Sequence, residues 1–354
     1  MAREPPACRV LRRCVAAAAA LLLGGCSTIG YYVQAVHGQF ALLAAARPIP
    51  DWLADPATPD ALKRRLELAR AIRAFASEQL GEPDNRSYTS YADLKRPAAV
   101  WNVFATPPLS LALKTWCYPL FGCAGYRGYF QRADAEALAA RLAGAGFDVD
   151  VAPIPAYSTL GWFNDPLLNT FIGWPDAELA RLVFHELAHQ IVYVGDDTAF
   201  NESFATAVER EGVRRWLAAR GDEAQRAAYL QFERRRADYV ALLLGYRARL
   251  QALYAGAEPQ AAMRERKQAL FAQLQVDYRA LRDGPWGGFA GYDRFFAQAL
   301  NNAHLAAVGA YYDDVPAFEA LLAREHGDLP RFYGAVKRLA KMKPAERDAA
   351  LHAP

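Results

Sequence analysis

Two short motifs restrict most strongly what this chain can fold into. The first is His185-Glu186-Leu187-Ala188-His189, and the second, Asn201-Glu202-Ser203-Phe204-Ala205, follows it closely. Residues four apart lie on the same face of an α-helix, so both imidazoles of the first motif can reach one metal ion. Glu186 lies about 100° around the same helix, beside that ion, where its carboxylate can take a proton from a bound water. The first motif therefore predicts a helix that carries a metal site.

Glu202 completes the ligand set that a catalytic zinc site requires. It stands thirteen residues after His189, near the start of a second predicted helix over residues 201–219. A catalytic zinc is typically held by three protein ligands with one position left open, and two histidines with a glutamate form one such set. We therefore predict that His185, His189 and Glu202 bind one Zn²⁺, with Glu186 as the general base. The alternative is that the two histidines are core residues and Glu202 caps a helix. The match of all three positions to a zinc ligand set would then be a coincidence.

Two further features accompany these motifs. The first helix is predicted to open near Pro175-Asp176, and apolar residues flank its histidines on both sides. Glu209 lies seven residues after Glu202, on nearly the same helix face. It is placed either to orient a ligand histidine from behind or to form a salt bridge within the helical layer, and the sequence leaves both open.

The first 25 residues have the features of a bacterial lipoprotein signal peptide. Four arginines lie among residues 3–13, and a nine-residue apolar run over residues 15–23 follows them. Such a run is too short to span a bilayer but suits a signal peptide. It ends in Leu-Gly-Gly-Cys at residues 23–26, which resembles a lipobox, so we expect Cys26 to be lipidated and to begin the mature chain. The alternative is ordinary secretion with an incidental Cys26. Ser27 after the cysteine favours an outer-membrane anchor on the periplasmic side of the cell envelope.

The cysteines predict one disulfide. Of the five, Cys8 and Cys14 leave with the signal peptide and Cys26 carries the lipid. Cys117 and Cys123 remain, on either side of a turn that contains proline and glycine. In an oxidising compartment an even remaining pair indicates a disulfide, here one that closes a small loop.

Composition and periodicity indicate a helix-rich α+β protein. The chain has 354 residues, 53% of them hydrophobic, which is ample for a core, and its net charge is only +3. Its arginines are scattered, so nucleic acid is not indicated as a partner. We expect residues 26–220 to hold a small mixed sheet and both zinc-site helices, and residues 221–354 to form a helical region packed on the same unit. Further helices are predicted from an N-cap at Thr58 to Gly81, and over residues 223–254, 259–281, 315–326 and 329–339.

One predicted strand is placed where it can bind substrate. Residues 147–151 alternate apolar and acidic side chains, and we expect the strand to continue through Pro153 and Pro155 to Trp162. Prolines are admitted mainly at sheet edges. An edge strand shortly before the zinc helix can pair with an extended peptide. The alternative is that it only ends the sheet.

The motifs resemble a known group of enzymes. His-Glu-Leu-Ala-His at 185–189 with Asn-Glu-Ser-Phe-Ala at 201–205 is similar to the gluzincins, the zinc peptidases that include thermolysin and the alanyl-aminopeptidases. With Cys-Tyr-Pro at 117–119, Tyr-Arg-Gly-Tyr-Phe at 126–130 and Tyr-Ser-Thr-Leu-Gly-Trp-Phe at 157–163, the chain resembles a bacterial family of predicted lipoprotein zinc aminopeptidases. The resemblance implies a gluzincin-like fold, a peptide substrate and a membrane partner reached through the lipid.

The resemblance also implies roles for single residues. Tyr157, Ser158, Thr159, Leu160 and Gly161 take the place of the substrate-pairing strand, but they lack the glutamate with which alanyl-aminopeptidases hold the free amino group. Exopeptidase specificity then requires another carboxylate, for which Asp165 and Asp197 are the candidates, or it is absent. Gluzincins stabilise the oxyanion with a tyrosine or histidine, for which Tyr311 and His304 are candidates by residue type.

Two rivals to the aminopeptidase interpretation stay open. One is a zinc endopeptidase. The other is a non-catalytic envelope lipoprotein with a structural zinc site, against which Glu186 argues, because a structural site needs no free carboxylate between two ligands.

Overall fold

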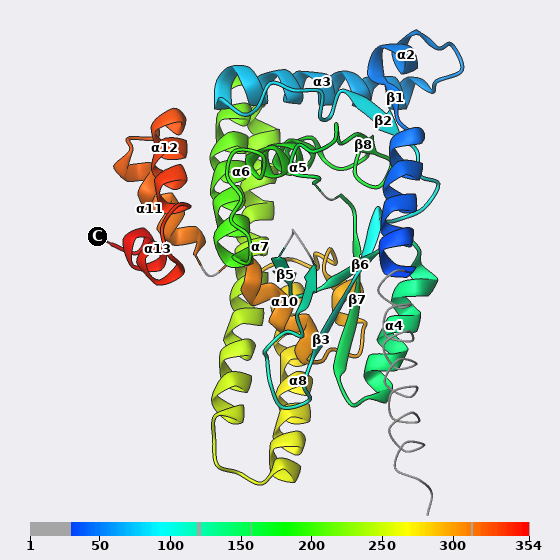
Figure 1. Ribbon diagram of the computed structural model, residues 1–354. Coiled ribbons are helices and arrows are strands. Elements are labelled where there is room, and N and C mark those ends of the chain that lie inside the picture. Colours follow the sequence, from blue (N-terminus) through cyan, green and yellow to red (C-terminus); the bar gives the residue numbers. More distant parts are fainter. Residues whose placement is uncertain (1–29, 119–121, 157, 313, 354) are drawn as a thin grey trace, which may run out of the picture. The chain divides into compact units, whose positions relative to one another are not determined.

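The computed structural model describes residues 30–118, 122–156, 158–312 and 314–353, with the backbone alone at residues 309–312 (Figure 1). The chain divides into two compact units, one ending at Ala45 and the other spanning Ala46–Pro354. The described part of the first is a helix over residues 30–44. The predicted signal peptide over residues 1–25 and Cys26 lie outside the described residues.

The second unit is built mainly of helices. They are α2 (Ile49–Ala54), α3 (Asp60–Leu80), α4 (Arg132–Gly144), α5 (Asp176–Ala188), α6 (Thr198–Arg220), α7 (Glu223–Tyr254), α8 (Gln260–Asp283), α9 (Asp293–Phe296), α10 (Asn302–Tyr312), α11 (Val315–Arg324), α12 (Leu329–Leu339) and α13 (Pro344–Leu351). The predicted helix-rich α+β class is confirmed. None of the helices in the described ranges is both long and apolar enough to cross a bilayer.

The strands form small separate sheets. They are β1 (Arg47–Pro48), β2 (Ser90–Ala92), β3 (Val100–Thr106), β4 (Trp116–Tyr118), β5 (Gly122–Ala124), β6 (Arg127–Tyr129), β7 (Asp148–Ile154) and β8 (Leu167–Leu168). They pair in the orders β1-β2-β8, β6-β3-β7 and β4-β5. Strand β3 is buried at every residue, and β7 pairs antiparallel with its whole length, from Val100 opposite Ile154 to Thr106 opposite Asp148.

Strand β7 occupies a sheet edge as predicted, but it is shorter than expected. It ends at Ile154, and residues 159–162 form a turn, closed by a hydrogen bond from the N–H of Trp162 to the carbonyl of Thr159, instead of a continued strand. The backbone explains the difference, because Leu160 and Gly161 have φ angles of +57° and +81°, and a strand cannot contain two successive residues in the left-handed region. The turn therefore cannot pair with a peptide as a strand of the sheet.

The helical predictions hold with small shifts at their ends. Helix α3 begins one residue later than expected, because Pro59 occupies the N-cap and no side chain caps it, so the predicted cap at Thr58 is wrong. Gly81 ends α3 in the left-handed conformation, as predicted. Helices α7 and α8 match the predicted pair within two residues. Whether residue 220 separates two regions stays a prediction.

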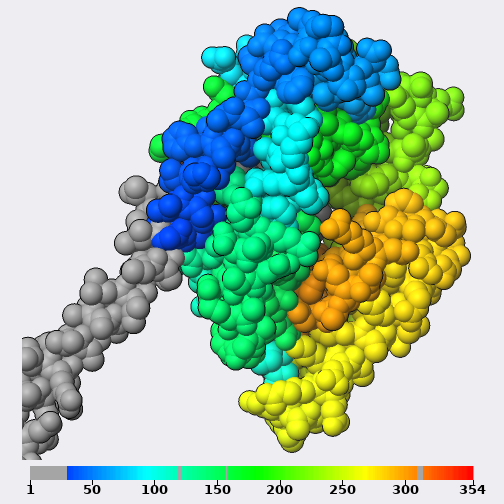
Figure 2. Space-filling model, turned by 90° about the vertical axis from the view of Figure 1, so that its right-hand side faces the viewer, coloured from blue at the N-terminus to red at the C-terminus, as the bar shows by residue number. Residues whose placement is uncertain are grey.

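The α7–α8 hairpin has its own hydrophobic core. The buried side chains come from α7, α8 and the segment that follows them, and they are Leu243, Tyr246, Leu250, Leu274, Tyr278, Trp286, Phe296 and Leu305. Figure 2 shows the orange segment that includes α9 and α10 against the yellow α8. Helix α10 also contacts α6, β3 and β7, so it connects this hairpin to the sheet and to the helix that carries Glu202.

The predicted disulfide between Cys117 and Cys123 is confirmed, across the β4–β5 hairpin. The backbone N–H of Cys123 donates to the carboxylate of Asp196, in the loop between α5 and α6. A side chain at Gly122 would collide with this carboxylate, because a Cβ there would lie 2.4 Å from Asp196 Oδ1. The hairpin is thus attached to the loop that joins the two motif-bearing helices.

Candidate metal centre

Helices α5 and α6 bring the two motifs together. His185 lies in the last turn of α5 and His189 is its C-cap residue. After a short loop, α6 begins at Thr198, three residues earlier than predicted, because the Asp197 side chain accepts the N–H of Phe200 and caps the helix. Glu202 consequently lies in the first turns of α6, where the chain has just reversed toward α5.

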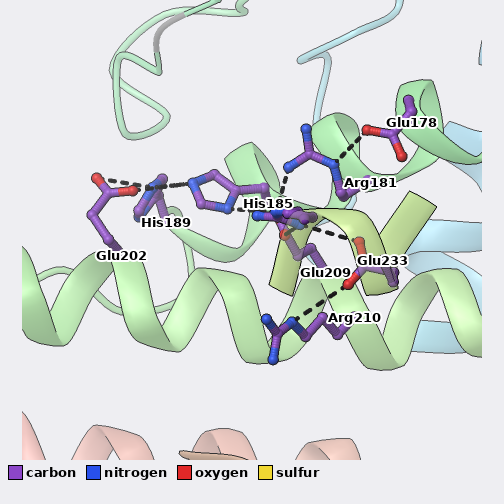
Figure 3. Close-up of polar contacts among 9 residues, drawn as sticks. Glu178, Arg181, His185, His189, Glu202, Glu209, Arg210 and Glu233 are labelled. Atoms are coloured by element: carbon purple, nitrogen blue, oxygen red, sulfur yellow. Dashed lines mark hydrogen bonds and ion pairs between the residues drawn. The ribbon is translucent and has the colours of Figure 1, made fainter. Parts of the chain in front are cut away.

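The three predicted ligands converge on one point (Figure 3). The Nε2 atoms of His185 and His189 are 3.2 Å apart, and Nε2 of His185 is 3.2 Å from Glu202 Oε2. The other carboxylate oxygen of Glu202 is 3.8 Å from Nε2 of His189. Zinc bonds of about 2.0–2.1 Å in a tetrahedron place ligand atoms about 3.3 Å apart. The spacing of these donor atoms therefore fits a single tetrahedral ion.

Glu209 holds His185 from behind. Its carboxylate is wholly buried and lies 2.9 Å from Nδ1 of His185, the ring nitrogen that faces away from the cluster. A carboxylate in this place fixes the tautomer that leaves Nε2 free for a metal and fixes the direction of the ring. The contact favours the orienting role over a salt bridge alone, although Glu209 also forms salt bridges.

Two arginines hold Glu209 in turn. Arg236 of α7 and Arg181 of α5 place guanidinium nitrogens 3.0 and 3.2 Å from its two carboxylate oxygens. Burial alone would raise the pKa of Glu209, but these guanidinium groups and His185 hold it well below its usual range. Glu209 therefore stays ionised inside the protein, as a partner for an N–H of His185 requires.

The ion pairs continue away from the centre through α5, α6 and α7. Arg181 also binds Glu178, at 3.0 Å, and Arg236 also binds Glu233, at 3.4 Å. Glu233 is in turn 3.8 Å from Arg210. Figure 3 shows this alternation of acids and bases leading to the ligand histidine. Paired charges of this kind cost less to bury than isolated ones.

The two histidines differ in charge before a metal binds. Burial alone would lower the pKa of His185, but its hydrogen bonds with Glu202 and Glu209 raise that pKa to about 10. Burial lowers the pKa of His189 to about 4, because its smaller electrostatic attraction to Glu202 does not compensate. At neutral pH the metal-free centre thus holds one imidazolium and one neutral imidazole, and a metal must displace the proton of His185.

Glu186 has the environment of a general base. Its side chain is buried, and burial raises the pKa of its carboxyl to about 7. Among the described residues, none donates a hydrogen bond to this carboxylate, in contrast to Glu202 and Glu209 beside it. A carboxylate with a pKa near neutrality and no fixed donor can both take up and release a proton.

The other predicted site residues already have partners. Asp165 accepts hydrogen bonds from the backbone N–H and the hydroxyl of Thr159, at 2.9 and 2.8 Å. Asp197 caps α6 and pairs with Arg347 at 2.5 Å. His304 lies between Asp150, 3.4 Å from its Nε2, and Asn301.

The turn over residues 159–162, with Ser158 before it, adjoins the end of α5. Ser158 accepts the N–H of Leu160 through its hydroxyl, at 3.1 Å. A Cβ at Gly161 would lie 3.4 Å from the Oε1 atom of Gln190, the residue that follows His189. Tyr157 and the side chain of Tyr311 lie outside what the structure describes.

The sequence did not single out the two arginines. Arg181 precedes His185 by four residues and so shares its helix face, which is a signal that could have been used. Arg236 stands 27 residues after Glu209 on a long charged helix, where nothing separates it from solvent-facing arginines.

Comparison with known proteins identifies the family. A family model described as "Putative aminopeptidase" matches residues 30–351, which is most of the chain. No curated protein and no solved structure was similar enough to match. The match covers both motifs and all of the helices around them. The chain therefore belongs to this family of putative aminopeptidases.

Proposed function

We propose that the protein is a zinc-dependent aminopeptidase of the gluzincin type. The observation that carries the proposal is the convergence of His185, His189 and Glu202 at tetrahedral spacing, with the carboxylate of Glu186 beside them and no hydrogen-bond donor to it among the described residues. Family membership supports a peptidase that acts on peptides. In this proposal the two histidines and Glu202 hold one Zn²⁺, and Glu209 keeps His185 in the ligating orientation.

The chain's own residues would perform the proton transfers. A zinc ion at this centre would supply Lewis-acid activation of water and of the peptide carbonyl. Glu186 takes the proton of the attacking water and later gives it to the leaving amine, for which a pKa of about 7 is well matched. Glu209 and its two arginines do not move protons, because their charges are fixed by one another. For the oxyanion, Tyr311 stays the candidate.

A zinc endopeptidase is the second candidate, because the two carboxylates predicted to hold a substrate's free amino group are already bonded to other residues. An aminopeptidase requires an acidic group for the substrate's free amine, and both predicted groups already have partners, Asp165 in Thr159 and Asp197 in Arg347. We assign substrate contacts to Tyr157, Ser158, Thr159, Leu160 and Gly161 in either case. The free carboxylate of Glu186 argues against a purely structural zinc site.

We also propose that the protein acts outside the cytoplasm. The support is the signal-peptide pattern of residues 1–25, the lipobox that ends at Cys26, and the disulfide between Cys117 and Cys123, which suits an oxidising compartment. Lipidated Cys26 would anchor the protein on the periplasmic side of the outer membrane. Mass spectrometry of the N-terminal peptide from a bacterial membrane fraction tests this, and an unmodified Cys26 would contradict it.

The proposed activity is tested by metal analysis together with peptide hydrolysis. The mature protein should bind one zinc ion and release N-terminal residues from unblocked peptides. Glu186→Gln should retain the zinc and lose at least about 100-fold in kcat, whereas Glu67→Gln, an exposed glutamate on α3, should change neither. Full activity of Glu186→Gln would overturn the mechanism. Zinc binding without cleavage of any peptide by the parent protein would overturn the enzyme assignment.

A further inference from the structure

We propose that Trp162, Phe163 and Tyr193 form an apolar subsite beside the metal centre, which selects peptides with an aromatic or large aliphatic side chain at the scissile bond. The inference deepens the proposed function and rests on it for the position of that bond. Its structural basis is the exposure of these three aromatic side chains, together with the approach of Tyr193 to His189 and of Gly161 to Gln190.

All three of these aromatic side chains are exposed to solvent. Trp162, Phe163 and Tyr193 are 77%, 42% and 52% exposed. The other large apolar side chains exposed in the described part of Ala46–Pro354 are Leu230, Val276 and Met342, which lie on separate elements. Scattered exposed apolar residues are ordinary on protein surfaces, whereas gathered ones indicate binding.

The two chain segments that carry the aromatic residues meet just after α5. The ring of Tyr193 lies 6.5 Å from that of His189. On the other element, Gly161 packs against the side chain of Gln190, and Trp162 and Phe163 follow it directly in the chain. Gln190 is itself fixed, because it accepts a hydrogen bond from Asn85 at 2.6 Å and donates one to Ser87 at 3.3 Å.

The turn that carries Trp162 and Phe163 is held in one conformation. The buried carboxylate of Asp165 binds both the N–H and the hydroxyl of Thr159. The same hydroxyl accepts the N–H of Phe163 at 3.1 Å, and the carbonyl of Thr159 accepts the N–H of Trp162 at 3.0 Å. Asp165 thus acts on the two aromatic residues through Thr159, and their exposure does not result from a loosely held loop.

Asp165 also places this turn within electrostatic range of Glu186, the proposed general base. Its backbone carbonyl accepts the N–H of Tyr88 at 2.6 Å, and its negative charge acts on both Glu186 and Tyr88.

A preorganised turn loses little conformational entropy when a ligand binds. Rigid aromatic rings near a reacting centre suit an apolar side chain, since they offer surface without charges that would have to be desolvated.

The subsite is tested with peptides that differ in one side chain. For the parent protein we expect kcat/KM for Phe-Ala to exceed that for Ala-Ala by at least about tenfold. Trp162→Ala and Phe163→Ala should each lower the value for Phe-Ala by about 3- to 10-fold and leave Ala-Ala within about twofold. Leu230→Ala, which removes an exposed leucine on α7, should change neither value. Equal loss on both peptides, or no preference in the parent protein, would overturn the subsite.

A binding measurement separates this inference from the proposed activity. In Glu186→Gln, calorimetric titration of the zinc-loaded protein with Phe-Ala and with Ala-Ala should show tighter binding of Phe-Ala, lost on adding Trp162→Ala. Preferential binding without turnover in the parent protein would leave the subsite standing and remove the enzyme assignment. Turnover of both peptides with equal affinity would retain the enzyme assignment and overturn the subsite. Absence of binding by either peptide would overturn the subsite.

Discussion

Two clusters in the described part of the chain combine histidine and carboxylates closely enough to hold a metal ion, and they differ in almost everything else. One is His185, His189 and Glu202, and the other is Asp314, Asp348 and His352. In the first, the side chains are 17%, 8% and 18% exposed. In the second, Asp348 is 75% and His352 is 47% exposed. Both clusters bring histidine and carboxylate groups together, but the first has two histidines and is much more buried.

The larger difference lies in how the imidazoles are used. In the first cluster one nitrogen of each ring faces the shared point, and Glu209 fixes the other nitrogen of His185. In the second, Nε2 of His352 faces Asp314 at 3.6 Å and Nδ1 faces Asp348 at 3.4 Å. The two carboxylates of this cluster thus lie at opposite nitrogens of one ring, whereas Nε2 of His185 faces both other members of its cluster and its Nδ1 faces Glu209, which lies outside it. A metal centre is thus distinguished by the groups behind its ligands.

The most direct way to break this comparison is to remove one histidine from each cluster. His185→Ala should weaken zinc binding by more than about 100-fold, since losing a ligand costs more than losing the group that orients it. His352→Ala should leave one zinc per chain, bound as tightly as before. The measurement is metal content after dialysis, with affinity from chelator competition. Full zinc content in His185→Ala, or a second zinc lost from His352→Ala, would reverse the contrast.

The two ligand histidines differ in pKa, which gives a second contrast, this time within the first cluster. With the pKa of His185 raised to about 10, its proton must leave before zinc binds, so affinity should rise about tenfold per unit from pH 7 to pH 9. The total change is about 100-fold. His189, with its pKa lowered to about 4, contributes nothing in this range. Chelator competition at pH 7, 8 and 9 measures the slope, together with one proton released per zinc at pH 7. A flat profile would show that His185 is already neutral.

The support behind His185 should matter less than the ligands themselves. Glu209→Gln removes the charge that holds the ring and should weaken zinc binding by about 10- to 100-fold. Arg236→Met leaves Glu209 with Arg181 and should have a smaller effect in the same direction, which Arg236→Lys partly restores. Arg234→Met, an exposed arginine on the same helix, is the matched control. Unchanged affinity in Glu209→Gln would mean that burial alone makes the first cluster a metal site.

The smallest effect is expected at the exposed cluster. Asp348→Ala should change the free energy of unfolding by less than about 0.5 kcal/mol, because an exposed ion pair gains little over its solvated charges. Urea denaturation followed by circular dichroism measures it. A loss above about 2 kcal/mol would show that His352 and its carboxylates are a structural unit. It would contradict the view that only the first cluster is held in place by its surroundings.

Sequence alone predicted the parts of the fold in which periodicity is long. Helices α7 and α8 each extend for more than twenty residues, so their limits were found almost to the residue. The turn at Thr159 was not found, because the run from Phe147 to Trp162 reads as a continuous strand. Its true structure depends on Asp165, whose side-chain contact with Thr159 no local pattern expresses.

The site divides in the same way. His185, His189 and Glu202 were predicted because helix spacing and a known donor set connect them over a short distance in the chain. Arg236 could not be found, because its contact with Glu209 depends on the packing of α7 against the site, which is a property of the tertiary structure. Tyr193 escaped for a related reason, as a single aromatic residue after a helix has no periodicity.

The short separation of His189 and Glu202 has a consequence for how the protein folds. A loop of about a dozen residues costs little entropy to close, and closure costs only slowly more with length. All three donors come from two consecutive helices, α5 and the start of α6, with its preceding loop, so their contacts have a low sequence separation. Contacts of this low sequence separation are usually made early. We expect zinc, where it is present during folding, to accelerate the pairing of α5 with α6, and the later docking of Arg236 to set the final affinity.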